Sequence, residues 1–285
     1  MRFDVDWVDA FTDQPFGGNG CAVVHQGAGL NAATCKAFVR ETSLVECTFT
    51  GPSDIADIRV RYFLASREIP FAGHPTIATV AALRHRGLIG DGALTLDTGA
   101  GVVPVTAQGN TVSMTQIAPD FGAHVPADVV AAVGGIRASD ILHPPRFVST
   151  GLPFCITLLR DAATLDAVRF DMQAFRAYLD HLGLDSTDVM EPFWVTQTDT
   201  GTQARLLMAP PSPAEDPFTG SATGAMAAYL WAEGVIDTPS FVARQGDGLG
   251  RPGQAQVTVQ GPRNAITGVV VAGQSHVLMS GALML

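Results

Sequence analysis

The chain has 285 residues, of which 47% are hydrophobic, and its formal net charge is −10. This hydrophobic content supports a substantial core, and the length exceeds that of a usual single domain. The acidic balance argues against broad nucleic-acid binding and against binding to anionic membranes, because both need a basic surface. An anionic ligand would need a local site of positive potential, because the chain as a whole is acidic.

The first residues and the cysteines predict a cytoplasmic protein. Residues 1–6 include two aspartates and no long apolar run follows, unlike a signal peptide. The four cysteines, at positions 21, 35, 47 and 155, lack the spacing of a zinc site or a disulfide framework, so we interpret them as small buried or half-buried side chains. Neither glycine-rich nucleotide-binding motif is present, so the sequence gives no support to a nucleotide cofactor.

The first half of the chain is predicted to be mostly β-strand. Alternating hydrophobicity and turn residues predict strands at 3–11, 21–24, 44–49, 58–64, 93–98, 101–107 and 111–117. A helix is predicted from Asn31, a typical N-cap residue, to about Thr42. The loop 14–20 (QPFGGNG) has three glycines near Asn19 that let a ligand approach the backbone, although most such loops are plain connections.

Glu46 stands out by its place in the strand predicted at 44–49. Val45, Cys47 and Phe49 form the more apolar face, so Glu46 must point the other way. Two interpretations stay open: a solvated strand carboxylate, or a carboxylate directed into a cleft.

The second half is predicted to begin after an interdomain linker at 119–126. Helices are expected at 127–133 and 172–182. Strands are expected at 146–150, 154–159, 193–197, 203–209, 240–244, 255–260, 266–272 and 276–284. The last of these strands is expected to return to the first domain.

Two segments repeat each other and organise the chain. PFAGHPTIATVAAL (70–83) and PFTGSATGAMAAYL (217–230) are identical at seven of fourteen positions, which indicates a duplicated unit. Each is interpreted as a loop that leads into a helix: Ser221 is a strong N-cap residue type, and His74 precedes Pro75, a residue favoured at the first helical position. The unpaired N–H groups and the helix dipole of such a start outline an anion site.

The helices that follow are apolar all round, so each must be surrounded by other structure. About a dozen residues are too few to span a bilayer. We therefore predict an α+β fold of two similar domains, each a curled, mostly antiparallel, barrel-like sheet around a central apolar helix. The first domain is predicted at 1–118 with a C-terminal strand at about 276–285, and the second at 126–275.

If the two caps face each other, His74, Asp216 and Ser221 would meet in one cleft. Two helix N-termini suit a carboxylate and would stabilise an enolate-like charge during proton abstraction. His74, Asp216 and Glu46 are the candidate bases. Each residue at the two helix starts also has a purely structural interpretation. His74 could be a hydrogen-bonded residue at a helix start, Asp216 an acid favoured near a helix N-terminus, and Ser221 an N-cap.

Four segments together resemble the PhzF-like isomerase family of phenazine biosynthesis. They are VDAFTDQPFGGNG (8–20), ETSLVECTF (41–49), IPFAGHP (69–75) and EDPFTGSATG (215–224). The resemblance runs essentially end to end, and it implies the fold of the diaminopimelate epimerases, a homodimer, and catalysis without a metal or a nucleotide. The implied reaction is a proton shift in a small carboxylate, trans-2,3-dihydro-3-hydroxyanthranilate in the characterised branch.

The resemblance also assigns roles to residues. It implies that Glu46 is the catalytic acid/base and that His74 and Asp216 complete the catalytic set. The implied substrate-binding residues are Asn19, Gly73, Gly220 and Ser221.

Two departures from the family pattern bear on the substrate. Gly20 replaces the usual proline of the glycine-rich loop, and Val45 replaces a serine often found before the glutamate. Two other functions remain open: binding of a small metabolite without turnover, and racemisation or epimerisation by a carboxylate–histidine pair. A two-cysteine racemisation is disfavoured, because neither 70–76 nor 214–222 contains a cysteine.

Overall fold

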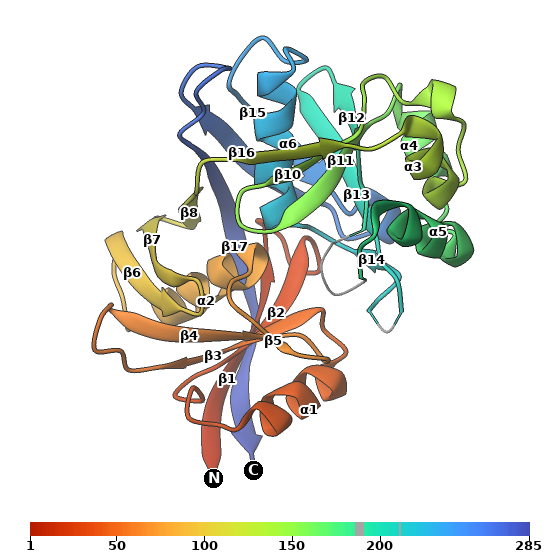
Figure 1. Ribbon diagram of the computed structural model, residues 1–285. Coiled ribbons are helices and arrows are strands. Elements are labelled where there is room, and N and C mark those ends of the chain that lie inside the picture. The colour runs from red at the N-terminus through yellow and green to blue at the C-terminus, as the bar shows by residue number, and fades with distance from the viewer. Residues whose placement is uncertain (186–190, 211) are drawn as a thin grey trace. The chain divides into compact units, whose positions relative to one another are not determined.

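The computed structural model describes residues 1–185, 191–210 and 212–285, which form a mixed α/β structure (Figure 1). The sequence predicts this mixed class. The chain divides into two compact units, Met1–Thr115 with Ala272–Leu285, and Gln116–Val271.

The first unit contains eight strands, the end of a ninth, β17, and two helices. Strands β1 and β17 are antiparallel, as are β1 and β2, whereas β2–β3 and β4–β6 are parallel pairs. The elements are β1 (Arg2–Ala10), β2 (Asn19–Val24), α1 (Ala32–Thr42), β3 (Glu46–Gly51), β4 (Ile58–Phe63), β5 (Glu68–Ile69), α2 (Gly73–His85), β6 (Gly92–Thr98), β7 (Gly101–Gln108), β8 (Thr111–Gln116) and β17 (Gly268–Met284).

The two helices of this unit differ in their surroundings. The α1 N-cap is confirmed, because the Asn31 side chain accepts a hydrogen bond from the Thr34 N–H at 2.9 Å. One side of α1 packs with Cys47 and Phe49 of β3 in an apolar cluster. In contrast, α2 is buried over nearly its whole length and packs against β1, β2 and β3. A helix buried on all faces needs no polar stripe, and α2 has none.

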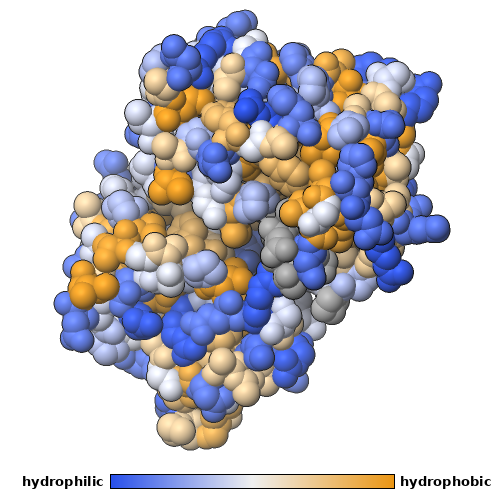
Figure 2. Space-filling view, viewed as in Figure 1, coloured by the Kyte–Doolittle hydropathy of each residue, from blue (hydrophilic) through white to orange (hydrophobic). Residues whose placement is uncertain are grey.

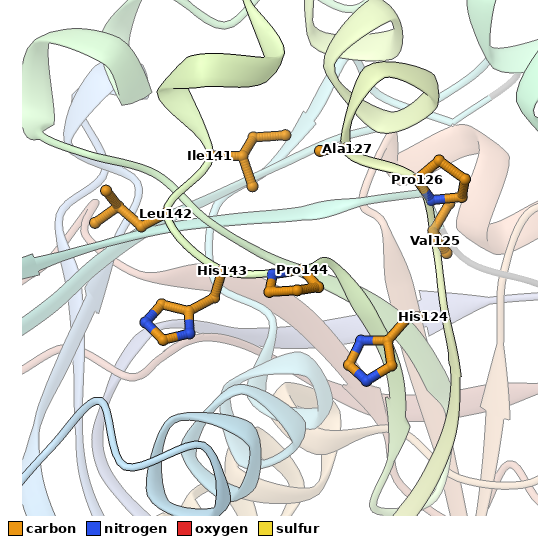
Figure 3. A pocket seen from close by; sticks show the side chains of 8 residues that line it. All are labelled: His124, Val125, Pro126, Ala127, Ile141, Leu142, His143 and Pro144. Atoms are coloured by element: carbon orange, nitrogen blue, oxygen red, sulfur yellow. The ribbon is translucent and has the colours of Figure 1, made fainter.

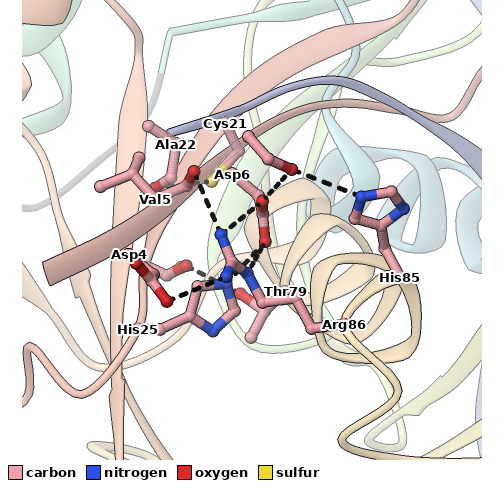
Figure 4. A network of polar contacts seen from close by, with 11 residues as sticks. Asp4, Val5, Asp6, Cys21, Ala22, His25, Thr79, His85 and Arg86 are labelled. Carbon is pink, nitrogen blue, oxygen red and sulfur yellow. Dashed lines mark hydrogen bonds and ion pairs between the residues drawn. The ribbon is translucent and has the colours of Figure 1, made fainter. Parts of the chain in front are cut away.

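A buried carboxylate ties the C-terminal end of α2 to the strands beside it (Figure 4). Asp6 of β1 is fully buried; it accepts hydrogen bonds from Arg86 at 2.9 Å and from Ser280 at 2.6 Å, and lies 2.8 Å from His25 Nε2. Burial alone would raise the pKa of Asp6, but these hydrogen bonds outweigh it and lower the pKa. The network therefore fixes the end of the helix whose first turn carries His74.

The described residues of the second unit form strands β9 to β16, the start of β17 and four α-helices. Helix α6 packs against β10, β11 and β16 and, like α2, is buried along nearly all of its length. The elements are β9 (Asp120–His124), α3 (Ala127–Gly134), β10 (Arg146–Ser149), β11 (Pro153–Leu158), α4 (Ala162–Ala167), α5 (Met172–Leu182), β12 (Phe193–Thr198), β13 (Gly201–Leu207), β14 (Glu215–Asp216), α6 (Gly220–Ala232), β15 (Ser240–Gln245) and β16 (Gly253–Gln260).

Three parts of the sequence prediction need correction. The expected linker at 119–126 contains β9, which pairs with β10. The two strands expected at 266–272 and 276–284 are one continuous strand, β17. Helix α4 and the two-residue strands β5 and β14 were not predicted, because such short elements show no periodicity of their own.

Both units contain an equivalent arginine–glutamate ion pair that lies outside the repeated segments 70–83 and 217–230. In the first unit Arg61 of β4 forms a two-point ion pair with Glu68 of β5, at 2.7 and 2.8 Å. In the second unit Arg205 of β13 pairs in the same way with Glu215 of β14, at 2.9 and 2.7 Å. Each glutamate lies two residues before the repeated Pro-Phe, so the two clamps occupy equivalent places. Both fix the short strand that leads into a helix start.

Charged and polar residues cover much of the surface in Figure 2, with smaller apolar patches between them. The exposed apolar side chains include Phe16, Ile55, Ile117 and Leu142. Within the described residues, none of the helices has the length and apolar character needed to cross a bilayer.

Candidate active site

In the first unit the candidate site is built around the start of α2. The helix begins at Gly73 with Ala72 as its N-cap, so His74 is the second helical residue rather than the cap. The N-cap residue Ala72 makes no side-chain capping bond. The first-turn N–H groups and the helix dipole therefore favour a negative charge here.

The His74 ring is buried and neutral. Its Nδ1 lies 3.1 Å from Asn19 Nδ2. The residue is 4% exposed, and this burial lowers the pKa of His74 to about 3, opposed only in part by a backbone hydrogen bond with Gly20. At neutral pH His74 can polarise or orient a group but carries no charge.

Glu46 is the first residue of β3, and it is not a solvated carboxylate. Its side chain is 14% exposed, and Oε2 lies 3.6 Å from His74 Nδ1. The face that Glu46 shares with Thr48 is directed towards α2, because the Thr48 hydroxyl lies 2.8 Å from that of Thr79. Since the imidazole is neutral, this contact is not an ion pair at neutral pH. The first unit thus brings Asn19, Glu46, Gly73 and His74 together.

In the second unit the candidate site lies between β14 and α6. Asp216 is the last residue of β14 and is only 4% exposed. Its Oδ2 accepts a hydrogen bond of 2.6 Å from the Thr219 hydroxyl. Gln245, at the end of β15, donates from Nε2 to the Asp216 carbonyl at 2.7 Å. Asp216 is therefore held by its side chain and by its backbone.

The start of α6 also differs from the prediction. The helix begins at Gly220 and its N-cap is Thr219, so Ser221 is the second helical residue and not the cap. The Thr219 side chain makes no capping bond, because its hydroxyl bonds Asp216 instead. Gly220 is buried and Ser221 is half-buried. Ser221 occupies the same helix position as His74 does in α2.

The equivalent short strand of the first unit forms without a carboxylate at the position of Asp216. Ile69 pairs with Tyr62 in the β4–β5 ladder, and Asp216 pairs with Leu206 in the equivalent β13–β14 ladder. The same backbone geometry thus forms with an apolar side chain in one unit and a carboxylate in the other. The buried carboxylate therefore keeps Asp216 a candidate functional residue.

Two polar side chains that sequence reasoning missed hold the first turn of α6. Gln116 donates from Nε2 to the Gly220 carbonyl at 2.9 Å, and its Oε1 accepts from the Thr150 hydroxyl at 2.6 Å. Gly224 makes room for this amide, since a Cβ there would lie 1.8 Å from Gln116 Oε1. Gln116 lies 104 residues from Gly220, so no local sequence pattern connects the two residues. The repeated glycine-rich helix start was the one sequence feature that pointed to this part of α6.

The second unit also has a surface pocket of about 560 Å³ away from these residues (Figure 3). Two histidines lie at its edges and the rest of its lining is apolar. The lining residues are His124, Val125, Pro126, Ala127, Ile141, Leu142, His143 and Pro144. None of the predicted site residues lines this pocket.

The described part of the chain contains no group of three or more His, Cys, Asp or Glu side chains that could bind a metal ion. The four cysteines are free and buried. Burial raises the pKa of Cys35 to about 11 and those of Cys47 and Cys155 to about 12, and raises that of Cys21 well above its usual value. These thiols are poor candidates for general bases.

Sequence comparison identifies the family. A model of the phenazine biosynthesis-like proteins (PhzC-PhzF) matches residues 8–281. The chain belongs to this family. The uncharacterized isomerase YddE of Escherichia coli O157:H7 is 31% identical, over 98% of this chain and 97% of that protein. Trans-2,3-dihydro-3-hydroxyanthranilate isomerase of Pseudomonas aeruginosa is 29% identical, over 96% of both chains. This PhzF-like protein is accordingly an isomerase.

Solved structures give the same result. The Bacillus anthracis phenazine biosynthesis protein of the PhzF family matches all of both chains, with a TM-score of 0.86 and 25% identity. A hydroxyproline epimerase from Agrobacterium vitis matches with a TM-score of 0.67, over 99% of this chain and 92% of that one. At 15% identity the second match shows a shared fold only.

Proposed function

We propose that this PhzF-like isomerase moves a proton between carbon atoms of a small carboxylate, with Glu46 as the acid/base and without a bound cofactor. The substrate class is a cyclic or amino carboxylate such as trans-2,3-dihydro-3-hydroxyanthranilate, on which the P. aeruginosa relative acts according to its name. One observation carries the proposal: Glu46 is largely buried and lies 3.6 Å from His74, which is neutral, beside an uncapped helix start.

The proton shift has two steps. Glu46 first removes a proton from carbon, and the electron pair left on the substrate is delocalised towards its carboxylate. The protonated Glu46 then delivers the same proton to a second carbon, which restores the starting enzyme. General acid/base catalysis of this kind typically contributes about 10²–10⁴-fold to the rate.

The other residues bind and polarise the substrate in this proposal. His74 and Asp216 orient it, while Asn19, Gly73, Gly220 and Ser221 bind it. The uncapped first turns of α2 and α6 support the binding role, because backbone N–H groups at a helix start stabilise a carboxylate and the charge that develops beside it. Asn19 also orients the His74 ring, because its Nδ2 lies 3.1 Å from Nδ1 of the imidazole.

Glu46→Gln tests the proposal, with Glu41→Gln as the matched control. Glu41 is an exposed glutamate of α1 in the same unit. With trans-2,3-dihydro-3-hydroxyanthranilate as substrate, Glu46→Gln should lower kcat by at least about 10²-fold and leave calorimetric binding nearly unchanged. Glu41→Gln should behave like the wild type. Turnover by Glu46→Gln within about threefold of the wild type would remove Glu46 from this role.

Two alternatives give different results with the same compounds. A metabolite-binding protein would bind the carboxylate but would cause no proton exchange. An epimerase would scramble the configuration of a chiral carbon without moving the double bonds. A thiol-based racemase is disfavoured, because the cysteines are buried and burial raises the pKa of each thiol.

We also infer that the protein has two similar domains, each a sheet around one apolar helix, and that it acts as a cytoplasmic homodimer. The equivalent Arg–Glu clamps and the repeated helix starts support the duplication. The free cysteines are consistent with a reducing compartment. Light scattering on the eluting protein should give twice the mass of one chain, and a single-chain mass would contradict the dimer.

A further inference from the structure

Gln245 is buried in the second unit, and its side-chain amide is hydrogen-bonded to the turn that follows Asp216 through both its nitrogen and its oxygen. It is 1% exposed. Its Nε2 donates to the Asp216 carbonyl at 2.7 Å and to the Thr219 hydroxyl at 3.1 Å, and its Oε1 accepts from the Thr219 N–H at 3.1 Å. These contacts span up to 29 residues of sequence. They connect the end of β15 to the turn between β14 and α6.

These contacts give the Thr219 hydroxyl a fixed direction. The amide N–H2 of Gln245 can only donate, so Thr219 Oγ1 accepts from it. The single hydroxyl proton of Thr219 is then donated to Asp216 Oδ2, 2.6 Å away. A hydrogen bond to a charged carboxylate is shorter and stronger than one between neutral groups. The donors therefore run in one order, from Gln245 through Thr219 to Asp216.

The first unit forms the same turn without such a chain of side chains. Ala72 is the N-cap of α2 where Thr219 is the N-cap of α6, and Ile69 occupies the place of Asp216. There the turn is held by a backbone bond, from the Ala100 N–H to the Pro70 carbonyl at 3.1 Å. The turn of the first unit thus forms without a hydroxyl or a carboxylate at these two positions.

A glycine keeps the end of β15 close to this turn. Gly246 follows Gln245 and has a φ of 92°, a conformation that side chains rarely adopt. A Cβ there would lie 2.2 Å from the Arg251 carbonyl oxygen and 2.7 Å from that of Pro217. The backbone of β15 can therefore pass close to Pro217, and Gln245 reaches the turn in one defined position.

We propose that Thr219 and Gln245 are positioning residues for Asp216: Gln245 directs the Thr219 hydroxyl, and that hydroxyl fixes the orientation of the Asp216 carboxylate towards the substrate. The inference rests on the proposed role of Asp216 in catalysis. A small misplacement of a catalytic group can cost about 10²-fold in rate. Neither residue needs to touch the substrate.

Crystal structures of the unliganded variants test the positioning without reference to activity. In the wild type and in Thr219→Ser, the Asp216 carboxylate should have one orientation. In Thr219→Val, which is similar in shape but lacks the hydroxyl, and in Gln245→Glu, which lacks the Nε2 donor, the carboxylate should rotate or occupy two positions. An unchanged carboxylate in Thr219→Val would overturn the inference whatever the kinetics show.

Kinetics with trans-2,3-dihydro-3-hydroxyanthranilate then connect the position to catalysis. Thr219→Val should lower kcat by about 10- to 100-fold with KM within about threefold, and Thr219→Ser should restore the rate. Thr223→Val is the control, because the hydroxyl of this buried threonine of α6 donates only to a backbone carbonyl, at 2.9 Å. An equal loss of kcat in Thr223→Val would show a general structural effect and overturn the positioning role.

A double-mutant cycle separates this inference from the proposed function. If Thr219 acts through Asp216, Thr219→Val should lower kcat in the wild type but not in Asp216→Asn. Additive losses would contradict the inference. If Thr219→Val moves the carboxylate while kcat stays at the wild-type value, the positioning stands and the catalytic role of Asp216 fails. If the wild type turns over none of the carboxylates tried, the proposed function fails and the crystal structures still decide the positioning.

Discussion

Protonation of His74 should make the fold sensitive to acid, and the size of the effect follows from its burial. In the folded protein burial lowers the pKa of His74 from 6.5 to about 3. Between these values the unfolded chain binds a proton that the folded chain does not, so the free energy of unfolding decreases as the pH falls. Each pH unit contributes about 1.4 kcal/mol, which gives about 3 kcal/mol between pH 6.5 and 4.5. Well above pH 6.5 His74 is neutral in both the folded and the unfolded protein, so it adds no pH dependence to the free energy of unfolding.

Urea unfolding of the wild type and His74→Gln at pH 7.5 and 4.5 measures this contribution. Glutamine does not titrate, so His74→Gln should be less stable than the wild type at pH 7.5. The difference in the free energy of unfolding between the two proteins should be smaller by about 3 kcal/mol at pH 4.5. The contributions of the other titrating groups are the same in both proteins and cancel in the comparison. His181→Gln, which removes an exposed imidazole of α5, is the control.

A constant gap between the wild type and His74→Gln at both pH values would refute the assignment of a neutral, buried imidazole. Nitrogen NMR provides an independent check on the charge of the ring. It should show a neutral His74 imidazole at pH 7.5 and still at pH 4.5, and an imidazolium at pH 4.5 would contradict the low pKa.

Three further predictions concern stability and reactivity. Gly224→Ala should lower the free energy of unfolding by roughly 1–3 kcal/mol, because the new Cβ displaces the hydrogen-bonded amide of Gln116; no change in urea unfolding would show that the amide relaxes at no cost. Tyr62→Phe should cost about 1 kcal/mol in the same assay, through loss of the 2.8 Å hydrogen bond to the Thr76 hydroxyl, and a loss below about 0.3 kcal/mol would contradict that estimate. All four cysteines should be unreactive towards a thiol reagent at neutral pH until the protein is unfolded, and rapid labelling of the native protein would contradict their burial.

Sequence reasoning predicted the parts of the fold that have a clear local pattern. Alternating residues predicted β1 and most other long strands, and Asn31 predicted the start of α1 correctly. The strand β9 was taken for a linker, because most of its residues are exposed and only pairing with β10 makes the segment a strand. Short or one-sided elements depend on tertiary partners that a sequence does not show.

Sequence reasoning named candidate residues for the site, but it did not predict which of their side chains are in contact. The repeat pointed to the starts of α2 and α6, and the parity of β3 correctly separated Glu46 from the apolar face of its strand. The neutral state of His74 follows from its burial, and its side chain contacts Asn19, 55 residues away; no local pattern indicates either feature. The contact between Thr219 and Gln245 is set by the register of β15 in the sheet.

The most direct test of the account is whether Glu46 moves a carbon-bound proton. The wild type, Glu46→Gln and Glu41→Gln would each be incubated in D₂O with trans-2,3-dihydro-3-hydroxyanthranilate and related small carboxylates, and proton NMR would follow the loss of C–H signals. We expect the wild type and Glu41→Gln to exchange a carbon-bound proton of at least one compound, and Glu46→Gln to exchange it at least about 10²-fold more slowly. Exchange by Glu46→Gln at the wild-type rate would contradict the account.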